Sequence, residues 1–134
     1  MNLKSTNVVL HGGKQAVPVA VTPSLYADLD RRFNGFKGRS LVAEHRFTKS
    51  WPTWERHPAG DEIVCLLSGR ASLVLHRRGG RQVVRLQKAG AFAIVPKGIW
   101  HTARIRTPTR MLFITPGAGT QNISLAEFRK RLSR

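Results

Sequence analysis

The sequence predicts an all-β protein, an antiparallel jelly roll or small barrel with a short helix near each end. Its 134 residues, 41% of them apolar, are enough for one hydrophobic core and too few for two ordinary domains. Twelve glycines and seven prolines interrupt the chain. Between them lie short runs rich in Val, Ile, Leu and Phe rather than long helical patterns, which is typical of a fold built from strands.

The first helix is expected to begin at residues 22–24 (Thr-Pro-Ser), where the threonine would cap the helix and the proline would occupy its first turn. Leu25, Leu29 and Phe33 follow at helical spacing and form one apolar face. Residues 34–38 (Asn-Gly-Phe-Lys-Gly) are rich in residues that end helices, so the helix should stop there.

From residue 40 the pattern changes to that of strands. Leu41, Ala43, His45 and Phe47 fall on one face of a pleated run. Eight strands in all are predicted, each bounded by residues typical of turns. The seven that follow the first span 51–57, 62–67, 71–78, 81–86, 91–95, 100–106 and 111–115.

Two further signals complete the outline. Residues 78–81 (Arg-Gly-Gly-Arg) predict a tight hairpin, because two glycines tolerate the positive φ angles of such turns. Residues 124–127 (Ser-Leu-Ala-Glu) fit a capping box, and Leu125, Phe128 and Leu132 then form an apolar helical stripe that can cover an edge or end of the barrel.

These elements predict a single domain over residues 1–134. The barrel is expected at about 40–116, with an N-terminal arm at 1–39 and a C-terminal helical tail at 117–134.

The charge of the chain indicates which kinds of partner it attracts. The 23 Lys and Arg against seven Asp and Glu give a formal net charge of +16, which attracts anions. The basic residues are scattered and are not interleaved with exposed aromatic residues, so nucleic acid is not the expected partner.

The single cysteine, Cys65, excludes an internal disulfide, and its apolar neighbours predict a buried side chain. No run approaches a membrane span and no secretory leader is recognisable, so we expect a cytoplasmic location.

Two separated segments combine histidine with carboxylate. Glu55 and His57 are two apart in a strand and should project from one face. A Pro-Ala-Gly turn leads to Glu62, and His101 follows a Pro-Lys-Gly turn on a later strand. Closure of a barrel can bring these side chains together. Imidazole and carboxylate suit a divalent transition metal such as Mn, Fe, Zn or Ni, whereas a structural zinc site would use several thiolates.

The first segment resembles the first motif of the cupin superfamily, a jelly-roll family. That motif runs Gly, five residues, His, one residue, His, three or four residues, Glu, six residues, Gly. Glu55, His57, Glu62 and Gly69 reproduce its spacing. Glu55 stands in place of the first histidine, and Lys49 in place of the opening glycine.

The second segment resembles the second cupin motif, which runs Gly, five residues, Pro, one residue, Gly, two residues, His, three residues, Asn. Gly90, Pro96, Gly98 and His101 match these intervals, and Ile105 replaces the final asparagine. The resemblance covers about residues 40–116. The glycines and proline shape the turns that would aim the ligands inward.

The resemblance implies that His57, Glu62 and His101 bind the metal. Glu55 would then be a fourth ligand or would mark a changed site, in which a free carboxylate serves as a catalytic general base. A carboxylate in place of a neutral imidazole lowers the charge of the site by one unit, which favours harder ions such as Mn or Fe.

The residues and the resemblance are compatible with several functions. One is a metal-dependent enzyme of the oxygenase, isomerase or lyase type, acting on a small organic substrate that is anionic if the basic charge selects it. Another is a non-catalytic module that binds or senses a small molecule. A third is a cupin without metal, with Glu55 paired to Arg46, Arg56 or another arginine. The resemblance also implies a homodimer, formed through outer sheet faces or by exchange of an N-terminal strand from residues 8–10 or 17–21.

Other polar and aromatic residues receive more ordinary assignments. His45 is expected to be a core or interface residue, His76 to be exposed, and Asp61 to make a turn or surface contact. Three tryptophans flank the proposed ligands and would either line a pocket or pack at the barrel rim: Trp51, Trp54 and Trp100.

Overall fold

The computed structural model describes residues 1–12 and 15–133, so Gly13, Lys14 and Arg134, which the predicted domain includes, lie outside the described residues. Eleven strands and two helices follow one another along the described chain. In order they are β1 (Thr6–Leu10), β2 (Ala16–Ala20), α1 (Leu25–Arg32), β3 (Ser40–Phe47), β4 (Thr53–Arg56), β5 (Glu62–Ser68), β6 (Ala71–Arg77), β7 (Gly80–Leu86), β8 (Phe92–Val95), β9 (Trp100–Ile105), β10 (Thr109–Thr115), β11 (Gln121–Ser124) and α2 (Leu125–Leu132).

The strands form two sheets in which every described pairing is antiparallel. The first sheet has the order β2-β1-β3-β10-β5-β8 and the second the order β11-β4-β9-β6-β7. Apolar side chains from both sheets meet in one core, including Leu66 of β5, Leu73 of β6 and Met111 of β10, none of which is exposed. Alternation along each strand sends these residues inward, as the period of two predicts.

The predicted strand pattern is confirmed. The eight strands expected from residue 40 onward are β3 to β10, with ends that differ by no more than two residues from those predicted. The all-β class with a short helix near each end is also confirmed. Closure of the two sheets as a jelly roll stays a prediction.

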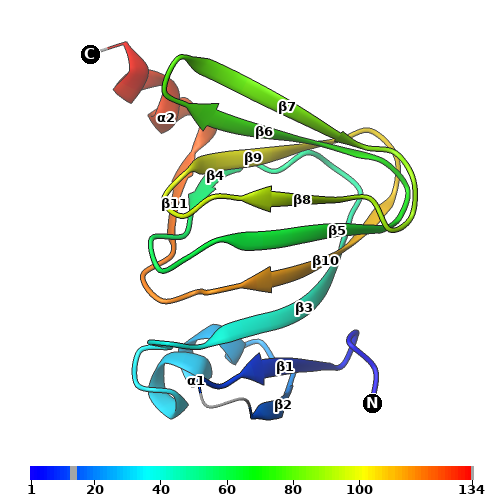
Figure 1. Cartoon of the computed structure of the whole chain (residues 1–134), viewed down its shortest axis with the longest axis vertical. Helices are drawn as coiled ribbons and strands as arrows, with labels where there is room; N and C mark the ends of the chain where they lie inside the picture. The colour runs from blue at the N-terminus through cyan, green and yellow to red at the C-terminus, as the bar shows by residue number, and fades with distance from the viewer. Residues whose placement is uncertain (13–14, 134) are drawn as a thin grey trace.

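The N-terminal arm adds to the first sheet. β1 and β2 form a hairpin, and β1 pairs with β3 of the same chain. α1 begins at Leu25, two residues later than the predicted start at Pro23, because its cap is Ser24 rather than Thr22. The Ser24 hydroxyl donates to the Asp28 carboxylate (2.9 Å) instead of capping a backbone N–H. Leu29 and Phe33 are buried in a second core cluster, at the end of the molecule opposite α2 (Figure 1).

The C-terminal segment contains one strand that the sequence pattern did not reveal. β11 pairs with β4 and leads into α2, whose predicted capping box is confirmed, because the Ser124 hydroxyl accepts from the Glu127 N–H (3.1 Å). The predicted apolar stripe is shorter than expected: Phe128 is buried, whereas Leu125 and Leu132 are exposed. No helix among the described residues has the length and apolar character needed to span a membrane.

Three local predictions need correction. Cys65 is only partly buried, because it lies on the outer face of β5 while its neighbours in the strand face the core. His76 is not exposed, because α2 covers it and places the Phe128 ring 5.2 Å away. The hairpin between β6 and β7 turns at Arg78 and Gly79, one residue earlier than the paired glycines indicate, since Arg77 is in register with Gly80.

Candidate metal centre

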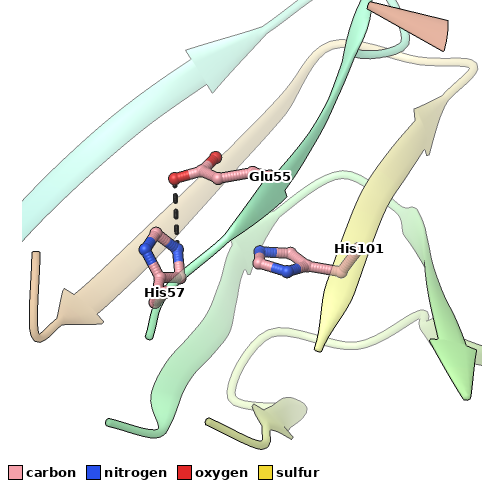
Figure 2. Close-up of side chains that lie close together, drawn as sticks. All are labelled: Glu55, His57 and His101. Carbon is pink, nitrogen blue, oxygen red and sulfur yellow. Dashed lines mark ion pairs between the residues drawn. The ribbon is translucent and has the colours of Figure 1, made fainter. Parts of the chain in front are cut away.

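Strand pairing brings the two predicted segments together. Glu55 on β4 lies directly opposite His101 on β9 in the register of the second sheet. His57 follows the last residue of β4, and Glu62 is the first residue of β5. The side chains of Glu55, His57 and His101 point toward one another from β4, the end of β4 and β9 (Figure 2). The structure therefore brings together all four residues singled out from the sequence.

The distances within the group are short. His57 Nε2 lies 3.1 Å from Glu55 Oε1 and 3.2 Å from Glu62 Oε2, and His101 Nε2 lies 3.2 Å from Glu62 Oε1. One ligand atom each from Glu55, His57 and His101 falls within 4.8 Å of the others, close enough to share one ion. Among the described residues no arginine forms an ion pair with Glu55, whose partner is His57. The pairing of Glu55 to Arg46 or another arginine is therefore not observed.

Burial separates the four residues into two kinds. The side chains of His57, Glu62 and His101 are 2%, 3% and 0% exposed, whereas that of Glu55 is 25% exposed. The first three are sealed in the protein interior. Glu55 alone combines contact with this group and access to solvent.

Hydrogen bonds on the far side of each imidazole fix which nitrogen faces the group. His101 Nδ1 donates to the Ile99 carbonyl oxygen (3.0 Å), which can only accept. The Thr120 hydroxyl donates to the Gly117 carbonyl (2.9 Å), so it accepts from His57 Nδ1 (2.8 Å). In the neutral form both Nε2 atoms therefore present lone pairs toward the carboxylates, as metal-binding histidines do.

The atoms at the centre lack well-directed hydrogen bonds. His57 Nε2, Glu62 Oε1 and His101 Nε2 are buried and have no hydrogen-bond partner among the described residues, although His57 Nε2 lies 3.2 Å from Glu62 Oε2 and His101 Nε2 lies 3.2 Å from Glu62 Oε1. Their separations are short enough but the directions are unsuitable for a donated hydrogen. Buried polar atoms without partners are costly, and a cation that accepts their lone pairs would satisfy all three. The donor set therefore fits a divalent transition metal.

Charges within the group shift two pKa values. Burial disfavours the charged imidazole of His57, but the carboxylates of Glu55 and Glu62 outweigh burial and raise the pKa to about 9. Burial likewise disfavours the Glu62 carboxylate, but the imidazoles of His101 and His57 outweigh it and lower the pKa to about 2. Without a metal, the pair therefore exists at neutral pH as imidazolium and carboxylate.

Backbone contacts tie the two motifs to each other. The Gly98 N–H donates to the His57 carbonyl (3.0 Å), and the Lys97 N–H donates to the Asp61 carboxylate (2.7 Å). Gly98 has a φ of 75°, which suits a glycine at this turn. The turn that precedes His101 is thus fastened to the segment that carries His57. Asp61 makes the turn contact predicted for it and stays outside the group.

A cavity of about 1010 Å³ opens beside Glu55, His57 and Glu62. Its aromatic wall contains Phe47, Trp51 and Phe113, and α1 supplies Tyr26 and Asp30. Burial lowers the pKa of His45, which also lines the cavity, although Glu55 and Glu62 oppose that shift. Of the three tryptophans, Trp51 lines this cavity, whereas Trp54 and Trp100 pack against Phe128 on the other side of the second sheet.

Sequence reasoning missed the residues that support the ligands. Thr120 accepts from His57, and the Thr115 hydroxyl donates to Glu62 Oε2 (2.6 Å). Both lie beyond the two motifs: Thr115 is the last residue of β10, and Thr120 directly precedes β11. No periodicity or spacing in the sequence marks them, because their role depends only on how the C-terminal segment returns to the site. Tyr26 and Asp30 were likewise unmarked, since the arm was predicted only as a helix.

No protein-family model matches the sequence, and no curated protein matches it. Solved structures do match. An oxalate oxidase covers 71% of this chain and 57% of its own, at 17% identity and a TM-score of 0.53. Oxalate decarboxylase of Bacillus subtilis, described with Mn(II) centres, covers 67% of this chain and 24% of its own, at 20% identity and a TM-score of 0.52. A cupin-2 domain protein of Shewanella frigidimarina covers 57% and 70%, at 21% identity and a TM-score of 0.49.

At these identities the likeness establishes the fold alone. The two enzyme structures with TM-scores above 0.5 share a fold with 67% and 71% of this chain. The chain spans about a quarter of the oxalate decarboxylase chain and 57% of the oxalate oxidase chain.

Proposed function

We propose that this chain is a small metal-dependent cupin enzyme. The observation that carries the proposal is the set of three buried, partnerless ligand atoms on His57, Glu62 and His101, beside a cavity with room for an organic molecule. Pockets with a few convergent polar groups in an apolar wall are the usual place for a substrate. The likeness to metal enzymes of the cupin fold supports the same conclusion.

In this proposal His57, Glu62 and His101 hold a divalent ion, and Glu55 completes the ligand set. A bound ion supplies Lewis-acid or redox chemistry. The two carboxylates favour Mn or Fe over softer ions. Because Glu55 lines the cavity and is the most exposed member of the group, we also assign it a catalytic role, in which it accepts a proton from the substrate. Oxygenase, isomerase and lyase reactions all use these functions.

The charged residues that line the cavity affect which substrate charge it favours. Three of the chain's seven acidic residues line it, namely Asp30, Glu55 and Glu62, against Arg46 and Lys49. With His57 as an imidazolium, the charged groups that line the metal-free cavity balance one another, so despite the net charge of +16 it does not attract anions. A divalent ion that displaces the His57 proton would leave the lining with one net positive charge. We accordingly propose an anionic organic substrate that binds only after the metal.

Metal content tests the proposal directly. Protein purified without chelator and supplied with Mn²⁺ should hold about one ion per chain, and His57→Ala and His101→Ala should each hold none, because each change removes one of few ligands. His11→Ala is the control, since His11 contacts Arg39 far from the group. Full occupancy in both ligand variants, measured by elemental analysis, would exclude these ligands.

Binding without turnover is the alternative function. The aromatic wall of Phe47, Trp51 and Phe113 would hold an organic ligand whether or not chemistry follows. Thermal-shift screening of small carboxylates with Mn²⁺-loaded protein, followed by product assays on each stabilising compound, separates the two. Stabilisation without product from every compound would favour a sensor.

We also propose a homodimer, based on an apolar strip across the outer face of the first sheet. Phe92 and Ile94 on β8 are 61% and 53% exposed. The strand register continues each of them into a row across the sheet. The Ile94 row contains Ile63, Ile114 and Val42, and the Phe92 row contains Cys65 and Leu112. A second copy offers the same apolar strip to an otherwise strongly cationic molecule, as an isologous contact requires. The Phe92 row ends on β3 at Glu44, whose charge is paired with Arg110.

Light scattering tests the dimer. Ile94→Asp should shift the protein to monomer, because it places a charge in the centre of the strip. Val83→Asp is the control, since Val83 is 40% exposed on β7, in the second sheet. A wild-type protein that remains monomeric at every concentration tested would contradict the proposal.

A further inference from the structure

The outer face of the second sheet carries positive charge that the metal centre does not use. α2 covers part of this face through Phe128. Beyond the helix, strand register places Ser72 of β6 between Arg85 of β7 and Arg104 of β9, and Arg81 lies on the same face of β7 as Arg85. All three arginines are exposed. The uncovered part of the face is therefore rich in guanidinium groups.

Three arginines from three different elements surround a depression of about 200 Å³ in this face. Arg81 comes from β7, Arg104 from β9 and Arg129 from α2. The Arg81 guanidinium lies over the Trp54 ring, 5.4 Å from its centroid, which restricts where it can move. We call this feature the arginine depression. Its arginines do not line the metal cavity, which opens beside Glu55, although Ser50 and Trp51 belong to both linings.

In the part of the chain that the structure describes, no carboxylate balances the charge of the arginine depression. None of its lining residues is acidic. Among the described residues Arg81, Arg104 and Arg129 form no ion pair, and the acidic residue of α2, Glu127, is paired with Arg131 instead (3.8 Å). Like charges brought together without a counter-ion repel one another, so a bound anion would relieve this repulsion.

Aromatic side chains, Trp51 among them, form part of the lining of the arginine depression. Trp51 forms part of its lining as well as part of the metal cavity. It is 9% exposed, and its indole N–H is buried without a hydrogen-bond partner among the described residues. The accessible donors are the three guanidinium groups, which can only donate, so an oxygen-rich anion is their chemical complement.

We infer that the arginine depression binds the phosphate group of a phosphorylated small molecule. The planar guanidinium offers paired donors that match phosphate oxygens, and three of them from different directions suit a multiply charged tetrahedral anion better than a single carboxylate. The small volume fits one or two phosphate groups rather than an extended polymer. This site does not depend on the metal centre and would add a second ligand class to the protein.

Calorimetric titration with inorganic pyrophosphate tests the inference. The protein is first freed of metal by chelation and dialysis, so that binding cannot occur through the metal centre. We expect saturable binding to the wild-type chain, with acetate as a non-binding control. Arg104→Gln and Arg129→Gln should each weaken binding about tenfold or more, the effect of losing a charge-assisted hydrogen bond. Arg104→Lys should also weaken it, because the forked geometry is lost.

Arg78→Gln is the matched control. It removes the same unit of charge from an exposed arginine in the β6–β7 turn, which does not line the depression. Its affinity should stay within twofold of the wild type. Equal weakening in Arg78→Gln and Arg104→Gln would refute the site and show that only the overall charge acts. No binding of pyrophosphate by the wild-type chain would refute it as well. A DNA oligonucleotide that binds more tightly than pyrophosphate and weakens equally in all variants would assign the charge to nucleic acid instead.

Discussion

Replacement of Thr120 by valine tests how the metal centre is built, without touching a ligand. The Thr120 hydroxyl accepts from His57 Nδ1 and donates to the Gly117 carbonyl. This chain of hydrogen bonds keeps the proton of the neutral imidazole on Nδ1 and its lone pair on Nε2, where the metal would bind. Valine has nearly the same shape as threonine but offers no oxygen, so it removes this control of the tautomer and of the ring orientation.

The expected loss is tenfold to hundredfold in affinity for Mn²⁺, the usual effect of deleting a hydrogen bond to a metal-binding histidine. This corresponds to about 1.4 to 2.8 kcal/mol. The structure favours a large effect, because His57 is 2% exposed and water cannot easily replace the lost acceptor at 2.8 Å. The His57 N–H and the Gly117 carbonyl would both lose a partner in the interior.

Competition titration against a fluorescent chelator measures the affinity, and Thr120→Ser provides the control, because serine keeps the hydroxyl. We expect Thr120→Ser to bind Mn²⁺ within about threefold of the wild type, as the same hydrogen bond can form. Circular dichroism should show that both variants are folded. Equal affinity in Thr120→Val, Thr120→Ser and the wild type would refute the reasoning, since the His57 tautomer would then need no support.

Three further predictions concern stability, measured by urea denaturation. Gly69→Ala should lower the free energy of unfolding by roughly 2 kcal/mol or more, because Gly69 has a φ of 82° and an added Cβ would overlap a carbonyl oxygen of the β9–β10 turn. Gly90→Ala is the control and should lower it by less, because there is open space around Gly90. Phe128→Ala should cost about 3 to 5 kcal/mol, because its buried ring is lost. In metal-free protein, His57, whose pKa rises from 6.5 to about 9, stabilises the fold fully below pH 6.5 and loses this effect as pH rises toward 9. Glu62, whose pKa falls from 4.5 to about 2, contributes above pH 4.5 and loses its effect toward pH 2, so stability should be greatest between about pH 4.5 and 6.5.

The strands that carry the ligands were readable from the sequence because local rules and tertiary structure agree there. Glu55 and His57 share one face of a strand, as the period of two requires, and the Pro-Lys-Gly turn ends at Gly98, which has the positive φ that glycine allows. The spacing of these turns then determined which residues could meet. The proximity of His57 and His101, with ring centroids 5.3 Å apart, follows from strand pairing that such spacing predicts.

The elements that sequence reasoning missed or misplaced depend on long-range contacts. β11 is a four-residue strand whose sequence, Gln-Asn-Ile-Ser, has no strong strand preference and becomes a strand through pairing with β4. His76 is hidden because α2, some 50 residues later, packs its Phe128 against it. Cys65 alternates with core residues, but periodicity within an apolar run cannot say which face is the outer one. In each case the deciding partner is remote in the sequence.

The carboxylate of Glu55 determines how the metal centre and the cavity respond to charge. With two carboxylates and two imidazoles, the metal-free group attracts a proton, which His57 holds up to a pKa of about 9. A divalent ion must displace that proton, so metal affinity should rise with pH over the range in which the metal-free fold loses stability. Once bound, the ion cancels the charges of Glu55 and Glu62, and Asp30 then faces Arg46 and Lys49 alone around the cavity. Metal binding therefore changes the charge of the cavity lining from balanced to one net positive charge, which makes the entry of an anion dependent on the metal.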